Sequence, residues 1–367
     1  MLPYSTQLIE QDDIDAINEA LRGSLLTQGH TVEKFEEYLC RFCDAKYALA
    51  FNSATSALYA AYNICDLKDS EVITTPISFV ATSNMILQNN ATPVFCDIKN
   101  DGNIDEKKIN SLITPKTKAI ASIDYGGKSV EALQIKELAK KNDLIFISDS
   151  SHSLGSRFKN QKVGSIADIS IFSFHPLKPI TTLEGGALLT NSQDFYEKAK
   201  LIRSHGVIKQ KLWHYDVLSN GFNFRMNEIQ ATLGITQLQK LERFIQIREE
   251  IASFYDDFFK DNPYFDTTHQ NNLYTSSNHL YPILLKKELW EKKEKIFHQL
   301  LENQIGVQVH YKPIYHFSFY QDKFSNLFLP QAEDFYNAEI SIPCHQKMDL
   351  TLAKKVAQKI LSILEKF

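Results

Sequence analysis

Short apolar runs alternate with longer amphipathic stretches between about residues 30 and 190. The runs predict strands at 47–51, 71–75, 92–97, 118–124 and 143–149, and helical patterns follow the first four of them. Strands that alternate with helices in this way favour a mostly parallel sheet with right-handed crossovers. Two further predicted strands, at 167–174 and 186–190, have only a turn between them, so we expect an antiparallel or edge strand there.

The chain after residue 192 is predicted to be mostly helical and then mixed. We expect helices at 194–204, 227–259, 288–304 and 349–367, and strands at 279–285 and 306–311. The region 227–259 contains one or two helices with a long apolar stripe of helical period. The expected fold class is therefore α/β. A large domain with a mostly parallel seven-stranded sheet spans residues 1–240, and a smaller α+β domain spans 241–367.

Composition limits the classes of function. The 367 residues include 40 basic and 44 acidic side chains, a net charge of −4, so a general nucleic-acid or membrane surface is not expected. The first residues lack the basic and apolar regions of a signal peptide, and no apolar run reaches the roughly 18 residues of a membrane span. The odd number of cysteines, five, argues against a disulfide framework. We therefore expect a cytoplasmic protein.

Cys40 and Cys43 form a CxxC motif, which binds metal or carries redox chemistry in some proteins. They lie in FEEYLCRFC, a pattern that predicts an amphipathic helix, and no second Cys/His pair follows at zinc spacing. The favoured interpretation is two partly buried helix residues, and no metal site is expected.

The segment SFHPLKPITTLEGGALLT, residues 173–190, contains the first candidate site residue. Lys178 precedes Pro179, and a residue before proline is disfavoured in a helix, so Lys178 should lie in an extended turn. Its neighbours are apolar although lysines are usually exposed. An ordinary loop lysine is the alternative, and this segment taken alone favours that alternative.

Two other segments carry polar groups at the ends of predicted strands. Asp149 ends the apolar strand LIFISD, and ligands of open α/β sheets bind outside the carboxyl ends of the strands. In FNSATSAL, residues 51–58, a strand leads into a helix whose free N–H groups suit an anion. A turn or N-cap aspartate, and ordinary helix capping by Ser or Thr, are the alternatives.

The order of these segments is more specific than any one of them. A helix start suited to phosphate, a strand-end aspartate and a strand-end lysine follow one another, with Lys178 29 positions after Asp149 (178 − 149). This order resembles the fold-type-I transferases that depend on pyridoxal 5′-phosphate (PLP). Further segments over nearly the whole chain resemble the DegT/DnrJ/EryC1/StrS family of sugar aminotransferases: TPISFVATSN (75–84), PVFCDI (93–98), NIDEKKI (103–109), LIRSHG (201–206), GFNFRMNEIQATLG (221–234) and VHYKPIY (309–315).

The resemblance implies roles for particular residues around bound PLP. Lys178 is expected to bind the cofactor covalently and to move protons as general acid and base, and Asp149 to face the pyridine nitrogen. Phe79 is expected to stack on the ring, and His152 to lie near the phenolic oxygen. The residues implied to hold the phosphate are Ala54, Thr55, Ser173 and, from a neighbouring subunit, Asn223.

The resemblance also implies that residues from three segments bind the sugar nucleotide. Its candidate residues are Tyr4, Ser24, Leu25, Leu26, Thr27, Gln308, Val309, His310 and Tyr311. For His310, a strand-end histidine bonded to backbone is the alternative. The chain departs from many family members at Ser148, where they have glutamate, and at Ala54, where they have glycine. Both changes are small and leave the hydrogen-bonding groups in place.

The motifs most resemble a branch of the family that acts in pseudaminic acid biosynthesis. This implies amino transfer from L-glutamate to C4 of a UDP-linked 4-keto-6-deoxy-N-acetylhexosamine, in a homodimer with shared active sites. Amination of another nucleotide-linked keto sugar at C3 or C4 is the first alternative. Sugar dehydratases of this fold have histidine in place of the lysine, so Lys178 disfavours them. A non-catalytic binding protein is disfavoured because Lys178, Asp149 and the phosphate loop are all retained.

Overall fold

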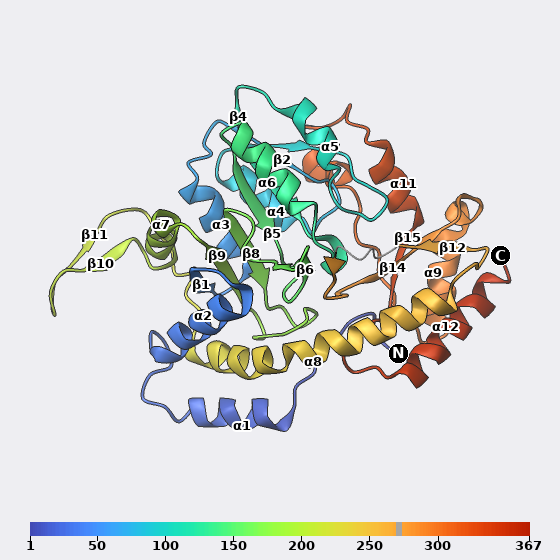
Figure 1. Cartoon of the computed structure of the whole chain (residues 1–367), viewed down its shortest axis with the longest axis horizontal. Coiled ribbons are helices and arrows are strands. Elements are labelled where there is room, and N and C mark those ends of the chain that lie inside the picture. The colour runs from blue at the N-terminus through green and yellow to red at the C-terminus, as the bar shows by residue number, and fades with distance from the viewer. Residues whose placement is uncertain (269–273) are drawn as a thin grey trace.

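The computed structural model describes residues 1–268 and 274–367. A seven-stranded sheet forms its centre, in the order β1-β9-β8-β5-β4-β2-β3 (Figure 1). Its strands are β1 (Tyr47–Phe51), β2 (Glu71–Thr74), β3 (Thr92–Phe95), β4 (Thr117–Ile123), β5 (Ile145–Asp149), β8 (Ile169–Ser173) and β9 (Gly186–Thr190). Strand β9 runs antiparallel to its neighbours β1 and β8, and the other neighbours pair in parallel. The seven predicted strands and the expected antiparallel entry are confirmed.

Helices cover the large sheet and connect its strands. They are α2 (His30–Cys43), α3 (Ala54–Ile64), α4 (Ala81–Gln88), α5 (Glu106–Ile109), α6 (Ala132–Lys141) and α7 (Gln193–Arg203), with 3₁₀ turns η1 (Asn110–Leu112) and η2 (Tyr125–Gly127). Helix α3 begins after the N-cap Ser53, whose side chain accepts a hydrogen bond from Ser56 N–H. Its buried face includes Ala57, Ala60 and Ala61. These small side chains let the helix axis lie close to the sheet.

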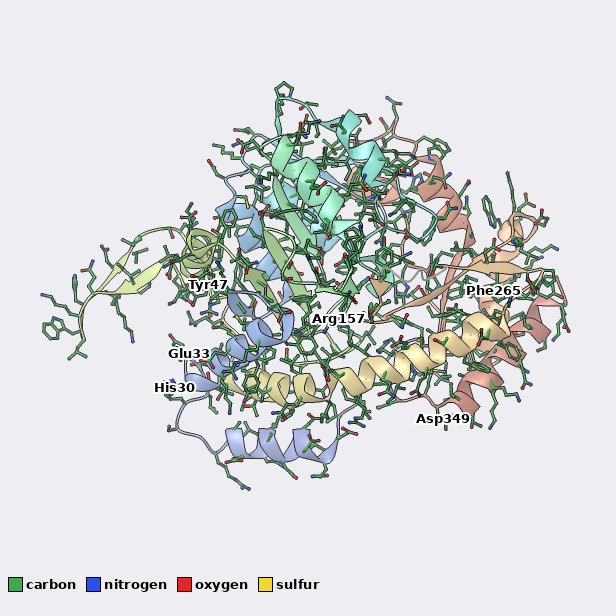
Figure 2. All side chains as sticks on the ribbon, viewed as in Figure 1. His30, Glu33, Tyr47, Arg157, Phe265 and Asp349 are labelled. Carbon is green, nitrogen blue, oxygen red and sulfur yellow. The ribbon has the colours of Figure 1, made fainter. Side chains whose placement is uncertain are left out.

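One long helix, α8 (Glu228–Phe258), contributes to a hydrophobic core in each domain, and Figure 1 shows it running from beneath the large sheet to the small domain. Leu241 and Phe244 pack in the large-domain core, whereas Ile251 and Tyr255 pack in the small-domain core. Figure 2 shows His30 and Glu33 near the start of α8, and Phe265 and Asp349 at the small-domain end. The predicted division at 240/241 lies inside this single helix, and the domain bounds stay a prediction.

The small domain is built on a three-stranded antiparallel sheet. Its strands are β12 (Phe265–Thr267), β14 (Tyr281–Leu285) and β15 (Glu339–Ile342), and its helices are η3 (Lys287–Lys292), α9 (Lys293–Glu302), η4 (Ile314–His316), α10 (Ser318–Gln321), α11 (Pro330–Ala338) and α12 (Leu350–Leu364). The remaining elements are α1 (Gln11–Ala20), the small sheet of β6 (Arg157–Phe158), β7 (Gln161–Lys162) and β13 (Tyr274–Thr275), and the hairpin of β10 (Val207–Lys209) and β11 (Tyr215–Val217).

A buried arginine joins α8 to the small domain. Arg248 is fully buried, and its guanidinium donates to the carbonyl oxygens of Cys344 (2.7 Å) and Asn278 (3.1 Å) and to Gln346 Oε1 (3.0 Å). Carbonyl acceptors satisfy these donors without a carboxylate partner, and burial lowers the pKa of Arg248 to about 10.

The strand expected at 306–311 is not formed. Gln308 makes only an isolated bridge to Ser341. Side chains take the place of strand partners at His310, because its N–H donates to Glu339 Oε2 and its carbonyl oxygen accepts from Tyr125 Oη. The backbone of His310 is therefore satisfied without a continuous strand ladder.

The cysteines and the hydropathy of the helices were the subject of two further expectations. Cys40 and Cys43 lie on α2 as predicted, and all five cysteines are free thiols. Within residues 1–268 and 274–367, no helix combines the length and hydropathy needed to cross a membrane.

Gly186→Ala is expected to lower the free energy of unfolding by about 1–3 kcal/mol, the usual range for an overpacked core. A Cβ at Gly186 would lie 2.4 Å from Ala54 N and 2.6 Å from Ala54 Cα, and neither backbone atom can move without displacing α3. Urea unfolding followed by circular dichroism measures the change.

The matched control for this substitution is Gly23→Ala, in the exposed turn after α1. There a Cβ meets a single atom closely, Ala20 O at 3.1 Å, so a change within about 0.5 kcal/mol is expected. Equal effects at the two glycines would contradict the close packing of α3 on β9.

Candidate active site

Three chain segments meet at the carboxyl ends of the parallel strands. Gly186 of β9 pairs with Phe51 at the end of β1 and with Ser173 at the end of β8. The missing side chain at Gly186 lets the start of α3, at Ala54, lie directly against this edge. As a result the predicted phosphate loop and Ser173 are neighbours, although the sequence separates them by more than 100 residues.

Asp149 ends β5 at the same edge, and its carboxylate is held in one orientation. Thr82 Oγ1, from α4, donates to Oδ2 at 2.6 Å, and Ser151 donates to Oδ1 through its hydroxyl at 2.5 Å and its N–H at 3.2 Å. These donors compensate a buried carboxylate for the water it has lost. Thr82 was not identified from the sequence as a site residue, because nothing in its surroundings marks it as a partner of Asp149.

Lys178 lies in the turn after β8, outside any helix, as the following proline predicts. Its N–H donates to His175 O (2.9 Å), and the preceding Leu177 O accepts from Ser5 Oγ (2.9 Å). Burial lowers the pKa of Lys178 to about 8, and the negative charge of Asp149 opposes that fall. A lysine with this pKa exists partly as the neutral amine near neutral pH, which is the nucleophilic form.

His152 is buried, and its surroundings define its tautomer. Burial lowers its pKa well below the usual value, and the positive charge of Lys178 acts in the same direction, so the ring is neutral. Nδ1 accepts a hydrogen bond from Gly126 N–H (3.3 Å), which leaves the proton on Nε2. Nε2 lies 3.2 Å from the Tyr311 hydroxyl, and the ring packs on His279 with centroids 4.4 Å apart.

A second buried carboxylate, Asp124, shapes the turn that carries His152. Asp124 Oδ2 accepts from the hydroxyls of Ser153 (2.7 Å) and Ser150 (3.0 Å), and Oδ1 accepts from Val130 N–H (3.0 Å). Burial raises the pKa of Asp124 and these hydrogen bonds oppose the rise. Sequence reasoning missed Asp124, although it ends a predicted strand just as Asp149 does.

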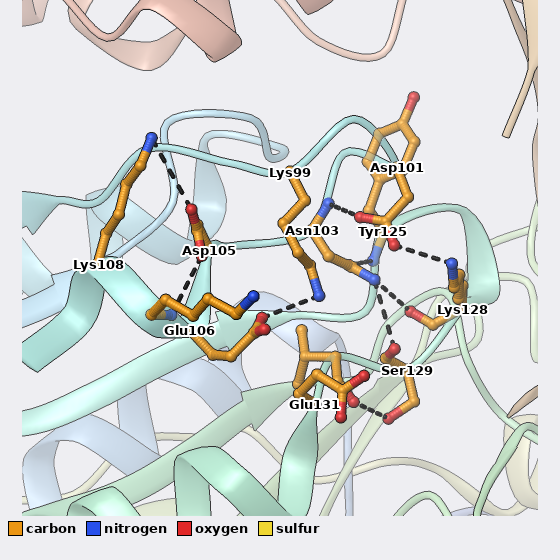
Figure 3. A network of polar contacts seen from close by, with 12 residues as sticks. Lys99, Asp101, Asn103, Asp105, Glu106, Lys108, Tyr125, Lys128, Ser129 and Glu131 are labelled. Carbon is orange, nitrogen blue, oxygen red and sulfur yellow. Dashed lines mark hydrogen bonds and ion pairs between the residues drawn. The ribbon is translucent and has the colours of Figure 1, made fainter. Parts of the chain in front are cut away.

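Tyr4, His310 and Tyr311 lie on the small-domain side of Lys178. The rings of Tyr4 and His310 are 5.1 Å apart between centroids. Tyr125 Oη donates to His310 O at 2.6 Å, and Tyr125 N–H donates to Asn103 Oδ1 at 2.8 Å. Figure 3 shows Tyr125 and Asn103 within a wider network that includes the ion pair of Lys128 with Asp101 (2.8 Å). This network therefore anchors the backbone beside the site.

The remaining predicted residues are surface groups. Phe79, just before α4, is 63% exposed. Asn223 is exposed, and its carbonyl oxygen accepts from Asn52 Nδ2 (3.4 Å), next to the start of α3. Gln308 is exposed beside the half-buried Val309. The loop of Ser24, Leu25, Leu26 and Thr27 is exposed at the start of α8, where Leu26 O accepts from Glu228 N–H.

The described part of the chain holds no group of three His, Cys, Asp or Glu side chains placed to bind a metal ion. The chemical groups at the strand edge are therefore a lysine of lowered pKa, an oriented carboxylate, a neutral histidine and a helix start. A helix start suits an anion, because its first N–H groups have no intrahelical acceptor.

Comparisons with known proteins agree with this geometry. The family model of the DegT/DnrJ/EryC1/StrS aminotransferase family matches residues 7–361. A Campylobacter jejuni protein (serotype O:23/36, strain 81-176), the UDP-4-amino-4,6-dideoxy-N-acetyl-beta-L-altrosamine transaminase, is 50% identical over 100% of this chain and 98% of its own. The structure of Helicobacter pylori PseC, an aminotransferase of pseudaminic acid biosynthesis, is 50% identical, covers 100% of both chains and has a TM-score of 0.97.

A more distant solved structure shows the same fold. The PLP-form of the putative sugar aminotransferase Spr1654 from Streptococcus pneumoniae is 28% identical over 100% of this chain and 99% of its own, with a TM-score of 0.94. From the family match over residues 7–361 and the full-length relatives at 50% identity, the chain belongs to the DegT/DnrJ/EryC1/StrS aminotransferase family.

Proposed function

We propose that this chain is a PLP-dependent aminotransferase that transfers the amino group of L-glutamate to C4 of a UDP-linked 4-keto-6-deoxy-N-acetylhexosamine in pseudaminic acid biosynthesis. The observation that carries the proposal is Lys178, whose pKa falls to about 8 beside Asp149 at the carboxyl edge of the sheet. The names of the relatives at 50% identity support the choice of sugar and pathway.

The residues present fit PLP by charge and by shape. The start of α3 offers the N–H groups of Ala54 and Thr55 to a phosphate, with Ser173 beside them. Phe79 leaves an apolar ring face exposed for an aromatic partner. Asp149, oriented by Thr82, can keep a pyridine nitrogen protonated. Bound PLP supplies an electron sink that stabilises negative charge developing at the carbon that bears the amine.

In the proposed reaction, Lys178 transfers protons and His152 donates a hydrogen bond. Lys178 Nζ can accept a proton from one carbon and return it to another, because a pKa of about 8 keeps both its forms accessible near neutral pH. His152 presents an N–H at Nε2 and can donate to the phenolic oxygen of the cofactor. Both groups lie where burial excludes much of the water, and this favours proton transfer within the site.

The proposal includes a homodimer with shared active sites. The hairpin of β10 and β11 projects from the body of the chain in Figure 1, and its tip exposes 98% of Leu212 and 81% of Trp213. Large apolar side chains of this exposure are typical of a surface that another chain covers. Asn223 and the loop 24–27 are exposed on the same subunit and are available to a neighbouring site.

Lys178→Ala is expected to abolish covalent attachment of PLP and to lower kcat by at least about 1,000-fold, since it removes both the attachment point and the acid–base group. Borohydride reduction followed by peptide mass spectrometry reads the attachment, and formation of 2-oxoglutarate reads the activity. The exposed Lys198, paired with Asp194 on α7, gives the matched control Lys198→Ala, which should retain both. Attachment at another lysine would contradict the proposed site.

The reactivity of Lys178 toward acetic anhydride, in protein free of PLP, is expected to rise with pH around a midpoint near 8. The neutral amine is the reactive form, and burial lowers the pKa at which it appears. Asp149→Asn should shift the midpoint to a lower pH, because the carboxylate of Asp149 raises this pKa. Mass spectrometry of the acetylated peptide measures both. A midpoint near the ordinary lysine value of about 10.4 would exclude a buried nucleophilic amine.

A further inference from the structure

A third buried carboxylate, Glu339, lies behind His310. Glu339 begins β15 and is fully buried, as is Ser341 two residues later. Oε2 of Glu339 accepts from His310 N–H at 2.7 Å, and Oε1 accepts from Ser341 Oγ at 2.5 Å. Both carboxylate oxygens therefore have donors, and one carboxylate holds both the backbone of His310 and the hydroxyl of Ser341.

The same serine also contacts the imidazole of His310, with Nδ1 and Ser341 Oγ 2.8 Å apart. A hydroxyl has one hydrogen, and Ser341 gives it to Glu339. Ser341 can therefore only accept from the ring, so Nδ1 carries the proton. Burial, together with the positive charge of Lys178, lowers the pKa of His310 to about 3, so the ring is neutral and its Nε2 has a free lone pair.

His310 and His152 are thus held in opposite tautomers. His152 accepts at Nδ1 from Gly126 N–H and offers a donor at Nε2. His310 donates at Nδ1 to Ser341 and offers an acceptor at Nε2. Tyr311, the next residue, contacts both: its hydroxyl lies 3.2 Å from His152 Nε2, and its ring packs edge-on against His310 with centroids 4.9 Å apart.

We propose that Glu339 and Ser341 are positioning residues that hold His310 in the Nδ1-protonated form, so that Nε2 accepts a hydrogen bond from an O–H or N–H group of the sugar substrate. The carboxylates of glutamate are themselves acceptors and have nothing to donate to this nitrogen, and its only N–H donor is the amino group that is transferred. The sugar ring carries hydroxyl and acetamido N–H donors. The proposal rests on the proposed function, and it assigns His310 to the sugar half of the reaction.

Ser341 donates its hydrogen to Glu339 only while Glu339 is ionised. Burial raises the pKa of Glu339 to about 7, while the donors Ser341 and His310 N–H and the nearby ammonium of Lys293 oppose the rise. Above neutral pH the carboxylate has no proton to donate, so the hydrogen of Ser341 must point toward it. Measurements at pH 8 therefore test the arrangement in its ionised state.

The experiment separates the two half-reactions of the PLP-loaded full-length enzyme at pH 8. Reaction with L-glutamate, and return with the UDP-linked 4-keto sugar, are each followed by the absorbance change of the cofactor. In Ser341→Ala, and in Glu339→Gln, the second-order rate constant with the sugar should fall about tenfold, the effect of losing one oriented hydrogen bond. The rate constant with glutamate should stay within about twofold of the wild-type value.

Ser170→Ala is the matched control, since Ser170 is equally buried in a strand, β8, and its hydroxyl has no hydrogen-bond partner within the described residues. It should leave both half-reactions unchanged. In a His310→Asn background, which retains a donor near the Nδ1 position and lacks Nε2, Ser341→Ala should cause no further loss with the sugar. A full additional tenfold loss there would show that Ser341 acts through another group and would overturn the inference.

A measurement without turnover completes the test. NMR spectra of protein labelled with ¹⁵N-histidine report the protonation of each ring nitrogen. The His310 signals, identified by their loss in His310→Asn, should show a protonated Nδ1 and an unprotonated Nε2. In Ser341→Ala this preference should weaken. A protonated Nε2 in the wild-type protein would sink the inference while leaving the aminotransferase proposal intact. Failure of the wild-type glutamate half-reaction would instead overturn the proposed function.

Discussion

The close approach of α3 to strand β9 is the constraint on which the site depends. Gly186 has no side chain, and the backbone of Ser53 and Ala54 occupies the space that a Cβ would fill. The same glycine pairs with Ser173 at the end of β8. A helix start, a strand-end serine and the turn with Lys178 are therefore held at one edge of a rigid sheet, where free N–H groups and a neutral amine are available together.

Buried carboxylates are hydrogen-bonded beside the candidate site residues around that edge. Asp149 is held by Thr82 and Ser151, Asp124 fixes the turn of His152, and Glu339 fixes His310. Each carboxylate loses water on burial, and hydroxyl and N–H donors replace that water. The cost of desolvation is offset only when every donor is in place, so these groups form a preorganised set within the candidate site.

Much of the fold could be predicted from the chain alone, because local patterns determine it. The apolar runs that end at Phe51, Asp149 and Ser173 carry the strand signal, and the lone break in strand–helix alternation marks the antiparallel β9. The prediction of a strand at 306–311 was wrong: only an isolated bridge forms at Gln308, and side chains of distant residues satisfy the backbone of His310. Apolar alternation reports which face is buried, and it carries no information about which partner satisfies a carbonyl or N–H group.

The sequence by itself determined the strand-end position of Asp149, the turn position of Lys178 after β8 and the helix start at Ala54, since each is set by neighbours a few positions away. Only the tertiary structure decided which groups orient them. Thr82 lies 67 positions from Asp149, and Ser341 lies 31 from His310, so no local pattern links these pairs. Hydrogen-bond direction depends on where one proton goes, and that is settled by the full set of donors and acceptors that folding brings together.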